Sequence, residues 1–256
     1  MFPGPRAAAG PDPEVVAGVP VAGDAASAGA VVGAPGAGDA VRTPAAVPAL
    51  ACGREHWARV GSMQLEISRE EAWNLLREWT ESDSLRRHML AVEAAMRAYA
   101  PRFGGDTELW GLAGLLHDLD YERYPNLEDG HPRHALRELE ARDYPPELVR
   151  AVASHADFMG VPREHPMEKA LYAVDELSGF ILACAYVRPE GLVGMTPKSV
   201  RKKLKQPSFA AAVNREELRE GAEQLGIEFD GHLQIVIGAL AERGEELMPR
   251  GASGDG

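Results

Sequence analysis

The stretch Leu115-Leu116-His117-Asp118-Leu119-Asp120-Tyr121 places a histidine beside an aspartate where an apolar helical pattern is about to end. Burying either polar side chain alone is costly unless it finds a partner. Taken alone, the dipeptide is most simply a capped helix end with one hydrogen-bonded core histidine. A divalent metal is a second option, because imidazole nitrogen and carboxylate oxygen both bind Zn, Mn, Fe or Co. At a helix end both side chains would reach one ion, and Asp118 would keep an oxygen to bridge to a second.

Two glycines precede this dipeptide on the same expected helix. Gly114 and Gly111 lie about one and two turns back from its end. Because glycine has no side chain, they predict that other helices approach this one closely.

Composition limits the classes of protein. The chain has 256 residues and a formal net charge of -12, which argues against a general nucleic-acid coat or a membrane-surface protein. Its two cysteines, Cys52 and Cys184, are far apart and form no CxxC motif, so neither a disulfide framework nor a cysteine zinc site is indicated. No apolar run reaches the roughly 18 residues of a membrane helix. We therefore expect a cytoplasmic protein that does not enter a membrane.

The first 60 residues are dominated by Ala, Gly, Pro and Val and show no hydrophobic period. This composition predicts a disordered leader over residues 1–62. Met63 opens the first patterned stretch and is a possible true start. The expected domain organisation is this leader, an all-α domain over residues 63–250, and a disordered tail over residues 251–256.

Residues 63–250 carry helical periods and no convincing period of two, which predicts an all-α fold. Ser68 with Glu71 forms a capping box, and the next helix is expected from about Leu85 to Tyr99. Caps or first-turn prolines predict the remaining helix starts, at Asp106 or Thr107, Pro132, Pro145-Pro146, His165-Pro166, Thr196-Pro197 and Asn214. The last helix is expected from about Gly231 to Met248.

Several expected helices present a polar group on an otherwise apolar face. These groups are His88, His117-Asp118, His155 and Asp175, and His131 joins them from the start of another helix. Histidines and acids from facing helices are how helical bundles build metal sites. The six groups exceed what one zinc ion takes and suit two ions bridged by Asp118. His134 competes with His131, but His131 at the cap faces back toward the His-Asp loop and is preferred.

The order His, His-Asp, His, His, Asp resembles the HD-domain superfamily of metal-dependent phosphohydrolases. The resemblance covers about residues 65–248 and is closest to small stand-alone bacterial proteins of the HDIG type. It implies an HD-type helical bundle in which His88, His117, Asp118 and Asp175 hold one ion, while His131 and His155 add a second. The sequence reads His-Asp-Leu-Asp where the HDIG pattern has His-Asp-Ile-Gly. The departure spares the expected ligands but loosens the HDIG assignment.

The chemistry that such a site offers is hydrolysis of a phosphate ester, from a nucleotide or another small phosphorylated metabolite. One or two divalent transition metal ions, Mn, Fe, Co or Zn, are the expected cofactor. Asp118, His131 and His155 are the expected catalytic residues. Asp120 and Asp157 are candidate hydrogen-bond acceptors behind the ligating histidines, although plain solvent exposure would explain them equally well.

A basic helix follows Thr196-Pro197. Lys198, Lys202 and Lys205 share one face of it, and Arg215 is a similar but weaker candidate. A cationic face beside a metal pocket would bind the substrate phosphate. The simpler interpretation is a solvated helix surface.

Two other functions remain open. The six-residue pattern also resembles HD-fold di-iron oxygenases, and degenerate members of the superfamily become non-catalytic regulators that bind a metal or a nucleotide. The ligand set does not separate hydrolase from oxygenase. The complete set counts against a degenerate regulator. The sequence makes no prediction of the oligomeric state.

Overall fold

The computed structural model describes residues 67–249, and these residues form α-helices and short 3-10 helices without a β-strand. The predicted all-α fold is confirmed. The predicted leader, residues 1–62, and the predicted tail, residues 251–256, lie outside the described residues. The elements are α2 (Arg69–Trp79), α3 (Asp83–Tyr99), η2 (Ala100–Phe103), α4 (Thr107–Leu116), α5 (Arg133–Ala141), α6 (Pro146–His155), η3 (Asp157–Met159), α7 (Pro166–Tyr186), α8 (Pro197–Leu204), α9 (Arg215–Gln224), α10 (Phe229–Glu242) and α11 (Gly244–Leu247).

Local capping chemistry sets most of the helix starts. Ser68 and Glu71 form the expected capping box of α2, and the Asp106 carboxylate caps α4 by accepting two backbone N–H groups. The helix α3 begins at Asp83, two residues before the expected start. The reason is Ser82, whose side chain accepts the N–H of Leu85 and therefore acts as the N-cap.

The helix expected from about Gly231 to Met248 begins two residues earlier in the structure and is divided into two helices. It begins at Phe229, because the Glu228 side chain accepts the N–H groups of Asp230 and Gly231. It is also interrupted at Arg243, whose φ of -112° and ψ of 22° leave the helical region. Gly244 follows, and glycine is a poor helix former. The result is α10 followed by the short α11.

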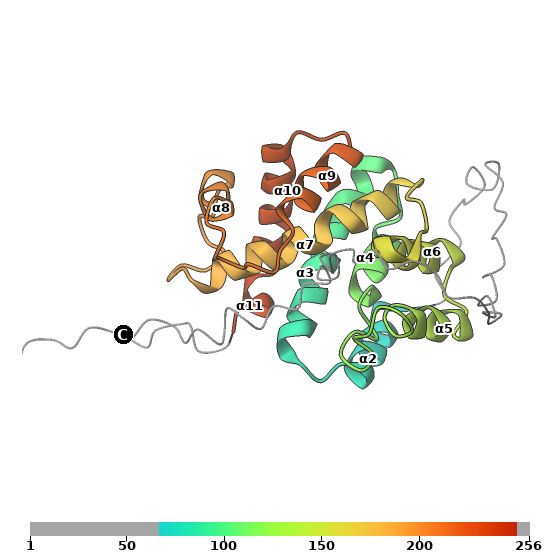
Figure 1. Cartoon of the computed structure of the whole chain (residues 1–256). Helices are drawn as coiled ribbons and strands as arrows, with labels where there is room; N and C mark the ends of the chain where they lie inside the picture. The colour runs from blue at the N-terminus through green and yellow to red at the C-terminus, as the bar shows by residue number, and fades with distance from the viewer. Residues whose placement is uncertain (1–66, 250–256) are drawn as a thin grey trace, which may run out of the picture. The chain divides into compact units, whose positions relative to one another are not determined.

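The centre of the described helices is made by α3, α4 and α7 (Figure 1). Nearly every residue of α7 from Met167 to Ala185 is buried, which matches its mostly apolar sequence. The predicted close approach at Gly114 is confirmed. A Cβ atom there would lie 2.8 Å from the backbone oxygen of Val92 on α3, so only glycine fits this contact without a shift. The approach brings the end of α4 against α3.

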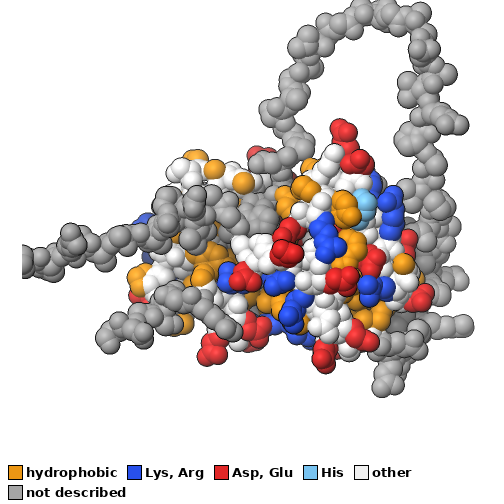
Figure 2. Space-filling view, turned by 90° about the horizontal axis from the view of Figure 1, so that it is seen from below, with side chains coloured by type: hydrophobic (Ala, Val, Ile, Leu, Met, Phe, Trp, Pro, Cys, Tyr) orange, Lys and Arg blue, Asp and Glu red, His pale blue; other side chains and the backbone are white. Residues whose placement is uncertain are grey.

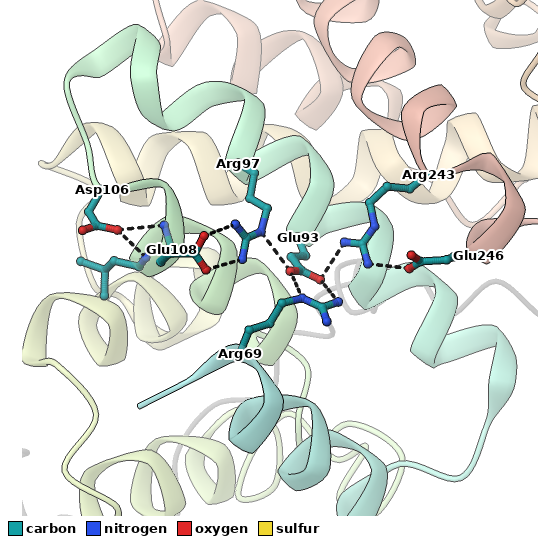
Figure 3. A network of polar contacts seen from close by, with 8 residues as sticks. Arg69, Glu93, Arg97, Asp106, Glu108, Arg243 and Glu246 are labelled. Atoms are coloured by element: carbon teal, nitrogen blue, oxygen red, sulfur yellow. Dashed lines mark hydrogen bonds and ion pairs between the residues drawn. The ribbon is translucent and has the colours of Figure 1, made fainter. Parts of the chain in front are cut away.

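A buried carboxylate ties the outer helices to α3. Glu93 is fully buried and accepts hydrogen bonds from Arg69 on α2, Arg97 on α3 and Arg243 between α10 and α11, at 2.5 to 3.0 Å (Figure 3). Burial by itself would raise the pKa of Glu93, but the hydrogen bonds from Arg69 and Arg243 outweigh it and lower the pKa. A buried charge persists only when it is paired in this way. The network therefore fixes α2 and the α10–α11 junction against α3.

Candidate metal centre

Six buried side chains from four helices and the adjoining segments converge on one point of the interior, and we call them the His/Asp cluster. They are His88 on α3, His117 and Asp118 at the end of α4, His131 before α5, His155 at the end of α6, and Asp175 on α7. All six were expected from the sequence, and the structure brings all six together.

The first half of the cluster consists of His88, His117, Asp118 and Asp175. The Nε2 atom of His88 lies 3.0 Å from Oδ1 of Asp175 and 3.3 Å from Nε2 of His117. The Nε2 atom of His117 lies 3.3 Å from Oδ1 of Asp175 and 3.4 Å from Oδ2 of Asp118. Two imidazole nitrogens and two carboxylate oxygens thus face one another, which is a donor set suited to a divalent transition metal.

The second half consists of Asp118, His131 and His155. The Nε2 atoms of both histidines lie 3.5 Å from Oδ1 of Asp118. Ligand atoms of His88, His117 and Asp118 lie within 4.8 Å of one another, and the same holds for Asp118, His131 and His155. Asp118 therefore belongs to both groups and turns one oxygen to each.

Two of the histidines take their orientation from helix ends. His117 and His155 lie at the C-terminal ends of α4 and α6, and each ring donates from Nδ1 to the carbonyl oxygen three residues earlier. These bonds reach Gly114 at 2.9 Å and Val152 at 2.5 Å. The last carbonyls of a helix have no partner within the helix, so they are free to accept. Sequence reasoning missed these two carbonyls, although a histidine at a predicted helix end is a signal for them.

Asp120 holds the third histidine. Its Oδ1 atom accepts a hydrogen bond from Nδ1 of His131 at 2.8 Å, and the carboxylate is fully buried. Of the two acceptors considered, Asp120 therefore lies behind a cluster histidine. Asp157 instead has a largely exposed carboxylate that pairs with Arg163 at 2.5 Å, which matches the simpler expectation of a surface acid.

Several cluster atoms have no hydrogen-bond partner. Among the described residues, Oδ1 of Asp118, Nε2 of His131 and Nε2 of His155 are buried without one. Buried polar atoms without a partner are rare, and each calls for an explanation such as an ion. Here the three atoms face one another across the second half of the cluster. The donor set and these atoms fit a bound metal ion.

The charges of the first half reinforce this fit. Burial lowers the pKa of His117, but the carboxylates of Asp118 and Asp175 outweigh burial and raise it well above its ordinary value. Burial would raise the pKa of Asp118 and of Asp175, yet His117 holds both pKa values below the ordinary range. The two carboxylates are therefore ionised. Their negative charge favours a bound cation in this buried space.

The other histidines lie outside the cluster. The ring of His134 stacks on Tyr124 at 3.8 Å between centroids, so the preference for His131 agrees with the geometry. His165 caps α7, and buried His232 hydrogen-bonds to Tyr99 and to the Ala173 carbonyl. His56 lies outside the described residues.

Two aromatic side chains that the sequence reasoning missed border the second half. The rings of Tyr121 and Phe158 lie 5.3 Å and 6.4 Å from the ring of His131, and Phe158 is partly exposed. Each follows a cluster histidine closely along the chain, Tyr121 four residues after His117 and Phe158 three residues after His155.

The predicted basic helix is α8, and the substrate-binding role of its lysines stays a prediction. Lys198, Lys202 and Lys205 are exposed on or next to α8, at the C-terminal end of α7 and apart from α4 and α6 (Figure 1). Arg215 instead donates to the backbone carbonyls of Phe209, Ala210 and Val213 and so fixes the loop before α9. None of these four cations is a member of the His/Asp cluster.

The surface elsewhere carries charges of both signs. On the face that Figure 2 shows, the acidic and basic side chains of the described residues are interspersed with apolar ones. Within residues 67–249, no helix combines the length and apolarity that a membrane crossing needs.

Comparison with known families agrees with this geometry. Residues 85–179 match the family model of the HD domain, which is consistent with the resemblance seen in the sequence. The match runs from the first core residue of α3 into α7 and includes all six cluster residues. HD domains bind divalent metals and give their name to a superfamily of metal-dependent phosphohydrolases. Searches of curated proteins and of solved structures returned no match to the chain.

Proposed function

We propose that this protein is a metal-dependent phosphohydrolase that cleaves the phosphate ester of a nucleotide or another small phosphorylated metabolite. The observation that carries the proposal is Asp118, whose Oδ2 faces His117 and whose Oδ1 faces His131 and His155. A carboxylate that divides its two oxygens between two sets of ligands is suited to bridge a pair of metal ions.

In the proposed site, His88, His117, Asp118 and Asp175 hold one ion, and Asp118, His131 and His155 hold the other. Bound divalent ions would polarise phosphate oxygens and lower the pKa of a bound water. The chain's own residues fix the geometry. The carbonyls of Gly114 and Val152 and the carboxylate of Asp120 each accept a ring N–H and so direct the opposite nitrogen of each ring inward.

Hydrolysis is favoured over phosphoryl transfer between two substrates. Nucleotide-binding phosphotransferases commonly cradle phosphates in a Gly-rich loop between a strand and a helix. The part of the chain that the structure describes has no strand to carry such a loop. Water is therefore the proposed acceptor of the phosphoryl group.

The test combines metal analysis with a substrate panel. The full-length protein should carry roughly one to two transition metal ions per chain, the number that this ligand set accommodates. Mn- or Co-loaded protein should release phosphate or a nucleoside from at least one ester in a broad panel, and Asp118→Asn should abolish the release. Wild-type metal content in both His117→Ala and Asp118→Ala would show that the site is wrong.

The di-iron oxygenase alternative shares this ligand set and makes a different demand. It requires iron and oxygen, and Mn would not support turnover. If anaerobic Mn-loaded protein is inert on the panel while iron-loaded protein consumes oxygen with a substrate, the hydrolase proposal is overturned.

A further inference from the structure

Asp120 makes three hydrogen bonds from one fully buried carboxylate. Its Oδ1 accepts from Nδ1 of His131 at 2.8 Å, and its Oδ2 accepts from the backbone N–H groups of His134 and Ala135 at 3.0 and 2.8 Å. The two N–H groups belong to the first turn of α5, whose N-cap residue, Pro132, provides no side-chain hydrogen bond. Asp120 therefore caps α5 from a distant segment and holds His131 with the same group.

The partners of this carboxylate determine its role. Two of the three contacts come from backbone N–H groups, and the carboxylate oxygens of Asp120 act as acceptors. His131 therefore carries its hydrogen on Nδ1, which leaves the lone pair of Nε2 directed toward Oδ1 of Asp118, 3.5 Å away. The imidazole is thus held between Asp120 at one nitrogen and Asp118 at the other.

The other cluster histidines are held differently. His117 and His155 donate from Nδ1 to main-chain carbonyls, which no side-chain substitution removes. Nδ1 of His88 has no hydrogen-bond partner among the described residues. His131 is therefore the cluster histidine whose Nδ1 hydrogen bond depends on a side chain, and it belongs to the second half alone.

From this contrast we propose that Asp120 is a positioning residue that controls binding of the second metal ion and leaves the first ion unaffected. The proposal rests on the proposed function, because it assumes that both halves of the cluster bind metal. It also gives a role to Asp120, one of the two residues at which this chain departs from the His-Asp-Ile-Gly pattern.

Asp120→Asn separates this role from the capping of α5. The asparagine oxygen can still accept the N–H groups of α5, while the amide NH₂ beside His131 can only donate to Nδ1. The hydrogen on the ring then moves to Nε2, where it blocks binding of a metal. The matched control is Asp106→Asn, because Asp106 caps α4 through two backbone N–H groups without touching a histidine.

The experiment titrates the metal-free full-length proteins with Co²⁺, followed by calorimetry and by the visible absorption of the bound ion. We expect wild type and Asp106→Asn to bind two ions. Asp120→Asn should bind the first ion with wild-type affinity and the second about 10- to 100-fold more weakly, the usual effect of losing a partner of a ligating histidine. Equal weakening of both ions, or unchanged binding of the second, would overturn the proposal.

A measurement on the wild type covers the case in which Asp120→Asn does not fold. In Zn-loaded protein with ¹⁵N-labelled histidine, assigned with a His131→Gln variant, Nδ1 of His131 should carry the hydrogen. A bare Nδ1 would overturn the proposal. The two proposals also fail in different ways. If the wild type binds no Co²⁺, the proposed function is overturned. If the wild type and Asp120→Asn both bind two ions, only the proposed role of Asp120 is overturned.

Discussion

The Oδ1 atom of Asp118 lies 3.5 Å from Nε2 of His155, and neither atom has a hydrogen-bond partner among the described residues. Both are buried, so the contact would be unfavourable unless something else occupied the space between them. A metal ion satisfies both atoms at once. The second half of the cluster therefore gives the most direct test of the site.

Removing one histidine of the second half should remove one ion. His131→Ala and His155→Ala should each lose the second ion and most of the hydrolytic rate, while the first ion stays bound to His88, His117 and Asp175. Metal content by elemental analysis and the rate on the best ester of the panel measure the two effects. His134→Ala is the matched control, since its ring stacks on Tyr124 outside the cluster, and it should retain both ions.

The position of α8 predicts that its lysines do not bind a small substrate. The triple variant Lys198→Ala, Lys202→Ala and Lys205→Ala should keep kcat/KM within roughly twofold of wild type at physiological salt, because exposed charges farther away than about 8 Å are screened. Steady-state kinetics on a small phosphate ester measure this. A tenfold rise in KM would return the lysines to the substrate site.

The contact at Gly114 predicts a loss of stability on adding a single methyl group. In Gly114→Ala the new Cβ would lie 2.8 Å from the Val92 oxygen and 2.9 Å from the Glu93 nitrogen, so α4 must move away from α3. We expect a net loss of roughly 1–2 kcal/mol in the free energy of unfolding, measured by chemical denaturation.

Gly238→Ala provides the control for this change. Gly238 lies within α10, and a Cβ there meets nothing within 4 Å. Alanine is the better helix former, so this variant should gain about 0.5–1 kcal/mol. Equal effects at the two glycines would contradict the close packing of α3 and α4.

Buried His232 predicts a pH dependence of stability. Burial lowers its pKa to about 4, outweighing the hydrogen bond to Ala173 that raises it. An unfolded chain binds the proton below its ordinary value of about 6.5, whereas the folded chain excludes it until about pH 4. The contribution of His232 is therefore complete above pH 6.5 and is lost progressively as the pH falls toward 4.

Denaturation of wild type and His232→Gln at pH 7.5 and pH 5.0 measures this contribution. Over that interval the wild type should lose about 2 kcal/mol more than the variant, by the linkage between the pKa shift and stability. His134→Gln, which leaves the buried histidine in place, should follow the wild type. The same pH dependence in His232→Gln and wild type would contradict the neutral buried state.

The sequence by itself determined the helices and the identity of the cluster. Apolar periods, Ser, Asp and Asn caps and first-turn prolines act within a few residues, so they are readable without a structure. They correctly placed His117 at a helix end and His88 and Asp175 on buried faces. Local signals did not predict the break between α10 and α11 at Arg243. The side chain of Arg243 forms an ion pair with Glu93 on α3, far away in the sequence.

Only the tertiary structure decided which groups meet. The distances from Asp118 to His131 and His155 depend on how α4, α5 and α6 pack, and no spacing along the chain encodes them. The same holds for Asp120. The sequence did not decide between an exposed and a buried carboxylate, and the packing places it behind His131. The lysines of α8 show the converse. Their spacing on one face was readable, but their distance from the cluster is set by the length of α7 that lies between them.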